Sequence, residues 1–175
     1  MKRQVSWALL AAGTAVAAAV TTAGPAAATS GSQTVNGTIV ASGVSGTRTV
    51  ITSVVIFKGA FNGVGKIVEV DNLPGDPDNV NRDDFVFASG RMHIVNTIED
   101  FAFSANPRSC VFTATIHQTN KIVGGTGQFT AAAGDFTATV TGRGVLPRGP
   151  DGSCDPSRDP LHEVDMITAT GTLSF

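Results

Sequence analysis

The sequence predicts one all-β domain, an eight-stranded antiparallel β-barrel with few or no helices outside the N-terminal segment. Beyond Thr34, apolar residues alternate at period two with Thr, Ser or charged residues, and Gly, Pro, Asn and Asp separate the alternating segments. A sandwich of two sheets is the alternative. We favour the barrel because many glycines lie within the expected strands, where they relieve crowding at tight bends, and because closure leaves no sheet edge exposed.

The alternation predicts strands at about residues 34–41, 48–57, 63–70, 84–87, 91–97, 99–103, 110–118, 136–144 and 162–175. The clearest is 110–118, in which Cys110, Phe112, Ala114 and Ile116 share one face. Two long connections, at residues 71–84 and 146–160, interrupt the pattern. Connections of this length are usually functional or disordered.

Residues 1–28 carry the features of a cleaved secretory signal peptide. Lys2 and Arg3 precede an uncharged run at residues 7–20, and three alanines end at Ala28, where we expect cleavage. An uncleaved anchor is the alternative, although the run is shorter than the roughly 20 residues of a spanning helix. The sequence therefore predicts a barrel domain at residues 29–175 that is secreted and free of a membrane segment.

The charge balance of residues 29–175 gives no sign of a nucleic-acid or membrane surface. Loss of Lys2 and Arg3 takes the formal net charge from −2 to −4, and the remaining basic residues are scattered. We expect neither nucleic acid nor a membrane as a partner.

Cys110 and Cys154 are the only two cysteines. In an oxidising compartment such a pair most often forms a disulfide, which we predict here. A catalytic thiol would not need the second cysteine, and a structural zinc site would need more ligands than two cysteines and three dispersed histidines supply. We predict no metal site and no cofactor.

A glycine-rich segment resembles a known family. Residues 121–136, KIVGGTGQFTAAAGDF, are similar to the Ile-x-Gly-Gly-Thr/Ser-Gly-x-Phe-x-x-Ala-x-Gly segment of the allene oxide cyclase and dirigent barrels. Glycines in such a segment allow positive φ angles, and we expect Phe129 to plug one end of the barrel. The residues that carry the fold motif are Gly124, Gly125, Gly127, Phe129 and Gly134.

This resemblance implies an eight-stranded barrel with an apolar cavity, trimeric in plant relatives, that binds or reshapes hydrophobic small molecules. Secreted proteins of actinobacterial type are also similar to this chain over most of its length. The chain contains no Tyr, a residue that the cyclases and dirigents use in their cavities. We therefore carry over no catalytic residue from the family.

Glu99 and His162 are the candidate catalytic residues. Glu99 is expected to share a face with Phe101 and Phe103 and so to reach the cavity, whereas parity argues mostly against Glu69 and Glu163. His162 opens the last strand beside a long connection and is expected near the barrel mouth. His117 is expected to face solvent, and His93 can point either way. The acidic connection at residues 71–84 is expected to be a solvated turn rather than a calcium site.

Whether the protein is an enzyme stays open at this stage. The favoured function is a secreted barrel that binds a small apolar ligand or a partner surface without catalysis. The alternative is a cyclase or isomerase that acts on a hydrophobic small molecule. A third possibility is a structural protein whose interior is filled by its own phenylalanines.

Overall fold

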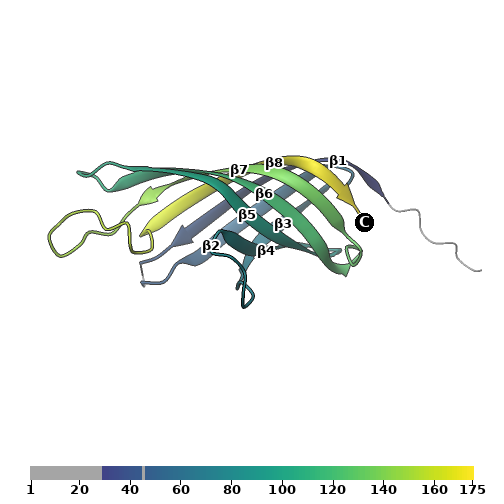
Figure 1. The fold of residues 1–175 in the computed structure, drawn as a ribbon, viewed down its shortest axis with the longest axis horizontal. Coiled ribbons are helices and arrows are strands. Elements are labelled where there is room, and N and C mark those ends of the chain that lie inside the picture. The colour runs from purple at the N-terminus through teal and green to yellow at the C-terminus, as the bar shows by residue number, and fades with distance from the viewer. Residues whose placement is uncertain (1–28, 45) are drawn as a thin grey trace, which may run out of the picture.

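The chain folds into a closed barrel of eight antiparallel strands (Figure 1). The computed structural model describes residues 29–175 except Ser45, and the predicted signal peptide at residues 1–28 lies outside this part of the chain. The predicted fold class is confirmed, and the described residues contain no helix. The strands are β1 (Ser30–Ser42), β2 (Thr49–Gly59), β3 (Gly63–Val70), β4 (Val80–Phe87), β5 (Gly90–Ala105), β6 (Val111–Gly127), β7 (Ala133–Val145) and β8 (His162–Ser174).

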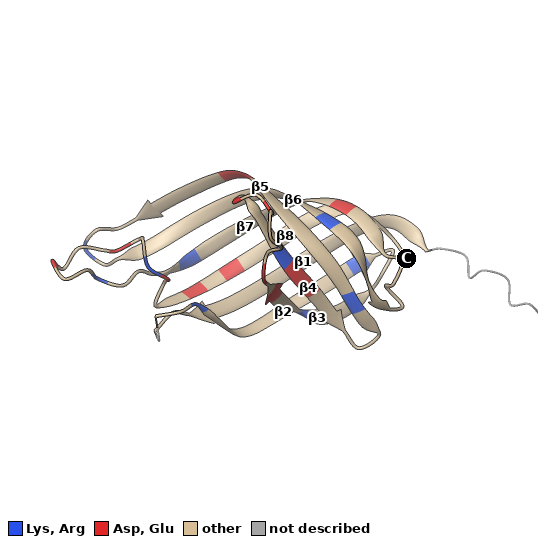
Figure 2. Ribbon diagram, turned by 60° about the horizontal axis from the view of Figure 1, so that its bottom comes forward, with Lys and Arg blue, Asp and Glu red and all other residues tan. Residues whose placement is uncertain are grey.

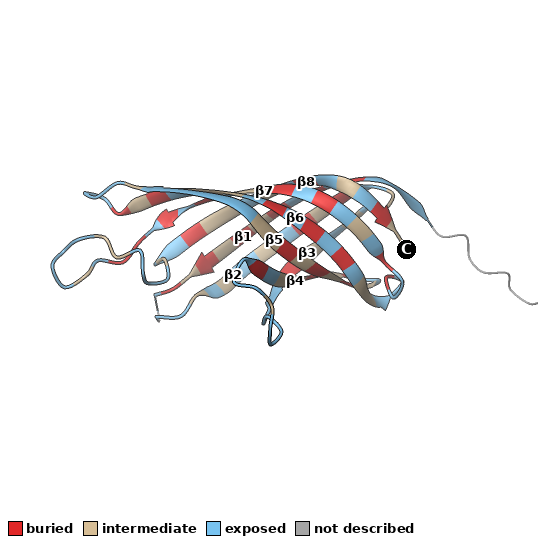
Figure 3. Cartoon of the chain, viewed as in Figure 1, coloured by how far each residue is buried: buried red, intermediate tan, exposed pale blue. Residues whose placement is uncertain are grey.

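Each strand pairs with the next one along the chain, and β8 pairs with β1 to close the barrel. The closing register is continuous from Ser30 opposite Ser174 to Ala41 opposite Glu163. Closure therefore pairs the backbone groups that an open sheet would expose along its two edges. Buried and exposed residues alternate along the strands, as Figure 3 shows, so the period-two pattern of the sequence separates the inner from the outer face.

Among the boundaries that differ from those expected, three affect the connections and the site. The segments 91–97 and 99–103 form one strand, β5, which continues through a β-bulge between Ile98 and Asp100. Strand β6 runs on to Gly127, so part of the glycine-rich segment lies within the sheet. Strand β4 begins at Val80, which shortens the acidic connection to residues 71–79.

Phenylalanines fill the end of the barrel at which β1 begins and β8 ends, which we call the base. Phe129 is fully buried, and its ring centroid lies 5.1 Å from that of Phe61 and 5.5 Å from those of Phe87 and Phe175. The space left beside this packing measures only about 10 Å³. The predicted role of Phe129 as a plug is confirmed. The phenylalanines of the base are Phe57, Phe61, Phe85, Phe87, Phe129, Phe136 and Phe175.

Two glycines of the resembling segment explain its composition. Gly127 has a φ of 61°, a left-handed conformation that other residues rarely adopt, where the chain leaves β6 for the turn that carries Phe129. At Gly134 a Cβ atom would lie 2.3 Å from the carbonyl oxygen of Thr172. Glycine is therefore required at Gly134 because β7 and β8 approach each other closely.

Unequal strand lengths leave the opposite end of the barrel open on one side. Strands β3 and β4 have 8 residues each, whereas β5 and β6 have 16 and 17. Pairing between β4 and β5 ends at Val80 opposite Thr97, and the β5–β6 hairpin projects beyond this point (Figure 1). We call this end the mouth; residues 106–110 and 146–161 belong to it.

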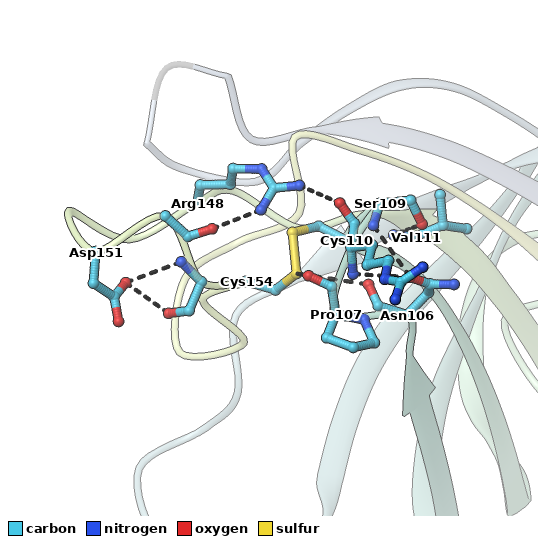
Figure 4. Close-up of a disulfide and its surroundings, with 11 residues drawn as sticks. Asn106, Pro107, Ser109, Cys110, Val111, Arg148, Asp151 and Cys154 are labelled. Carbon is cyan, nitrogen blue, oxygen red and sulfur yellow. Dashed lines mark hydrogen bonds between the residues drawn. A yellow bond between two sulfur atoms is a disulfide. The ribbon is translucent and has the colours of Figure 1, made fainter.

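The predicted disulfide between Cys110 and Cys154 is present (Figure 4). It joins the tip of the β5–β6 hairpin to the connection between β7 and β8. Cys110 is buried with Phe112 and Leu146, and the guanidinium of Arg148 donates hydrogen bonds to backbone carbonyls on both sides of the bridge. The bridge thus ties the tip of a hairpin to a long connection. Segments of both kinds are generally more mobile than the strands that they join.

We expect Phe129→Ala to lower the free energy of unfolding by about 3–5 kcal/mol, because it leaves a cavity among the rings of the base. The matched control is Val64→Ala on the exposed outer face of β3, which should change it by less than about 0.5 kcal/mol. Urea unfolding followed by circular dichroism measures both. Equal effects of the two substitutions would contradict the packing described for the base.

Replacing both Cys110 and Cys154 by Ala should lower the free energy of unfolding by about 2–4 kcal/mol, since the bridge spans 44 residues. The same measurement on the unmodified protein with and without reductant provides the control. An unchanged unfolding midpoint after complete reduction would show that the bridge contributes nothing to stability.

Candidate functional site

The half of the barrel interior nearest the mouth contains a cavity of about 380 Å³, which we call the mouth cavity. Ile39, Ile116 and Val140 form apolar parts of its wall. A groove of about 410 Å³ on the outer surface of β5–β8 has four threonines among its ten lining residues and only two charged side chains, Lys121 and Asp135. The mouth cavity is the candidate site because charged and amide side chains converge in it from opposite sides of the barrel: Arg48, Glu69, Asp83, Asn96, Gln118 and Asp165.

Arg48 is the centre of a charged network at the top of this cavity. Its guanidinium forms ion pairs with Glu69 of β3 and Glu163 of β8, and a longer one of 3.4 Å with Asp165. Its backbone N–H donates to the carboxylate of Asp159 at 2.8 Å. Arg48 therefore links the wall at β3 to the wall at β8, and acidic segments on these walls are coloured red in Figure 2.

Asp83 lies deeper on β4 and is held by a chain of amides. Asn96 donates to Asp83 at 2.6 Å, Asn120 donates to Asn96 at 2.8 Å, and Gln118 donates to Asn120 at 3.2 Å. All three amides are buried. The chain fixes the position of Asp83 because each amide is oriented by the next one.

Burial and like charges shift the ionisation of this site. Burial raises the pKa of Asp83 to about 6, and repulsion from Glu69 adds to the effect against the hydrogen bond from Asn96. Burial, with repulsion from Glu163, also raises the pKa of Asp165 to about 6. Burial lowers the pKa of Arg48, but the hydrogen bonds to Glu163 and Glu69 raise it more, so Arg48 remains charged.

The structure places Glu99 outside the cavity. Its side chain is exposed and accepts a hydrogen bond of 3.0 Å from Thr119 on the outer face of β6. The expectation that Glu99 shares a face with Phe101 and Phe103 is wrong because the bulge after Ile98 shifts the alternation by one residue.

The three histidines also lie on the outer face. His162 is exposed at the start of β8, opposite Val145, so it does not line the mouth cavity. His117 faces solvent, as expected. His93 contacts Asp84 at 2.6 Å, and Arg91 donates to the same carboxylate at 2.6 Å. This cluster is separate from the cavity because β4 directs Asp83 inward and Asp84 outward.

Glu69 and Glu163 are the site residues that the parity argument missed. Glu163 follows the alternation of β8 in phase with the buried Ala169 and Leu173, and Glu69 is in phase with the buried Ile67. The signal was present in the sequence, in the phase of each carboxylate relative to the apolar residues of its own strand.

One carboxylate of the acidic connection, that of Asp76, is paired with Arg82 of β4. Asp76 accepts hydrogen bonds of 2.7 and 3.0 Å from the guanidinium of Arg82 and one of 2.7 Å from the backbone of Leu73. Across residues 29–44 and 46–175, no three His, Cys, Asp or Glu side chains are grouped as metal ligands.

Comparison with known proteins gave no match to a family model, to a curated protein or to a solved structure. The part of the chain that the structure describes also has no helix with the length and apolar character to cross a membrane.

We expect Asp83→Asn to raise the free energy of unfolding at pH 7.5 by about 1–2 kcal/mol, because the raised pKa means that folding disfavours the ionised form. The folded state binds the proton more tightly, so the stability of the unmodified protein should fall as the pH rises from about 4 through 6. The gain from Asp83→Asn should vanish near pH 4, where the carboxyl is protonated in the folded state.

Urea titrations at several pH values measure this effect. The control is Asp135→Asn, a change to an exposed carboxylate on the outer face of β7. A loss of stability in Asp83→Asn at pH 7.5 would mean that the amide chain stabilises the ionised carboxylate more than burial disfavours it.

Proposed function

We propose that this protein is an exported β-barrel that binds a small molecule in the mouth cavity without changing it chemically. The observation that carries the proposal is the division of the interior into a filled base and a mouth cavity of about 380 Å³. Sites for small molecules have volumes of roughly 300–1,000 Å³ and combine apolar walls with a few fixed polar groups. The mouth cavity combines apolar wall residues with fixed polar side chains.

The polar groups of the cavity argue against a purely structural role. Burial of Asp83 and Asp165 works against folding, because it disfavours their ionised forms. Apolar side chains at these positions would extend the packing of the base and make the barrel more stable. A ligand that contacts the carboxylates gives them a function that compensates for this loss of stability.

The proposal includes the family and the compartment. The glycine-rich segment around Phe129 supports a barrel of the allene oxide cyclase and dirigent type, and the features of residues 1–28 support export. The disulfide between Cys110 and Cys154 supports an oxidising compartment, where such bonds persist. A homo-oligomer, trimeric by the family resemblance, is part of the same proposal, with no nucleic acid or membrane as a partner.

Asp83 and Asp165 favour a second candidate, a cyclase or isomerase that acts on a hydrophobic small molecule. Because the pKa of each carboxyl is about 6, protonated and ionised forms coexist close to neutral pH. Such groups can donate and accept protons during an isomerisation. Incubating an isolated ligand with fresh protein separates the candidates, since an isomerase would convert it and a binding protein would return it unchanged.

We expect native mass spectrometry of the protein purified from its natural source to reveal a bound small molecule. Val140→Phe, which places a ring in the cavity wall, should abolish the mass excess. The matched control is Thr141→Phe, the next residue on the exposed outer face of β7, which should retain it. An unmodified protein that shows no mass excess and binds no alkylammonium ion, alcohol or carboxylate would contradict the proposed function.

A further inference from the structure

We infer that the ligand of the mouth cavity is an amphiphile with a cationic ammonium head, and that its apolar tail lies along a row formed by Phe101, Phe103 and Phe112. The inference rests on the proposed function and names the ligand class of the same site. Two independent features carry it: the charge of the cavity, and the aromatic row that leads out of it.

Negative charge is in excess around the cavity. The carboxylates of Glu69, Asp83 and Asp165 line it. The single guanidinium of Arg48 is shared between Glu69, Asp165 and the neighbouring Glu163. Arg82 also lines the cavity, but its guanidinium is held by Asp76 outside this group. The cavity therefore favours a cation over an anion or a neutral molecule of the same shape.

Asp83 is the carboxylate that lacks a basic partner. In the described part of the chain, its side-chain hydrogen bond comes from the neutral amide of Asn96 rather than from a lysine or arginine. An ammonium group supplies several N–H donors and a full positive charge in a small volume. It would form an ion pair with Asp83, as Arg48 does with Glu163.

The aromatic row continues the cavity wall outward. Phe101 lies opposite Ile116, which lines the cavity, and Phe103 lies opposite Ala114 in the next inward-facing pair. The ring centroids of Phe101 and Phe103 are 6.2 Å apart, and those of Phe103 and Phe112 are 5.6 Å apart, with the planes inclined by 25° in both pairs. From Phe101, opposite Ile116, to Phe112 the row follows β6 for four residues, about 13 Å.

The row is exposed although it faces inward. Phe101 and Phe103 are 56% and 42% exposed, because β3 and β4 end too early to provide an opposite wall. Phe112 is buried at the disulfide and holds the far end of the row in place. A tail that leaves the cavity beside Ile116 would meet this apolar surface directly, and the contact would remove both exposed rings from water.

The test is isothermal titration calorimetry at pH 7.5 with butyl-, hexyl-, octyl- and decylammonium ions, each compared with the alcohol and the carboxylate of the same length. We expect the ammonium ions to bind at least about tenfold more tightly than the alcohols, and the carboxylates to bind most weakly. Affinity should rise about fourfold for each methylene group that the row buries.

Two variants separate the contribution of the ammonium head to the affinity from that of the apolar tail. Asp83→Asn should remove most of the preference for ammonium over alcohol while retaining the dependence on chain length. Phe103→Ala should reduce the increase in affinity from hexyl- to decylammonium and leave the affinity for butylammonium unchanged. The control is Glu99→Gln, which alters a carboxylate on the outer face of the same hairpin and should change neither.

Each contrary result has a distinct meaning. Equal binding of the ammonium ions, alcohols and carboxylates would overturn the cationic head and leave the proposed function standing. A Phe103→Ala protein with normal tail dependence but a lower oligomeric mass would overturn the tail assignment, because the row would then be a contact between copies of the chain. Absence of binding by every probe, with no retained ligand in native mass spectrometry, would overturn both proposals.

Discussion

The packing of phenylalanines in the base is the constraint on which the rest of the barrel depends. A chain of this size gains most of its stability from buried apolar surface, and the mouth cavity contributes little of it. Phe129 and the rings around it concentrate that burial at one end. The other end can then accommodate an open volume and several carboxylates without unfolding the sheet.

Arg48 has the corresponding role in the mouth. Glu69 and Glu163 come from strands on different sides of the cavity, and their repulsion would push these walls apart if no cation lay between them. The disulfide adds a covalent restraint where the sheet is least complete. The two ends are therefore maintained by different kinds of interaction: dispersion and apolar burial at the base, charge pairing and a covalent bond at the mouth.

Most of the fold could be predicted from the sequence because period-two alternation and turn residues are local signals. The disulfide followed from the number of cysteines, and the position of Phe129 followed from the glycine-rich segment. The site was harder to predict. Two partners of Arg48, Glu163 and Asp165, are more than a hundred positions away along the chain, and only the register between β1 and β8 brings them near it. Glu69 and Glu163 were within reach of phase analysis, whereas Glu99 was misplaced because a bulge leaves no clear mark in composition.

The bulge at Glu99 makes the inner face tolerant of a change in strand length. Glu99 has no partner on β6, because the pairing passes from Ile98 opposite Gln118 to Asp100 opposite His117. Phe101 and Phe103 therefore keep the phase of Ile116 and Ala114 on the inner face. Deletion of Glu99 would restore continuous pairing and leave both rings facing inward, so the loss of one residue at this point would alter the edge of the hairpin without reversing the aromatic row.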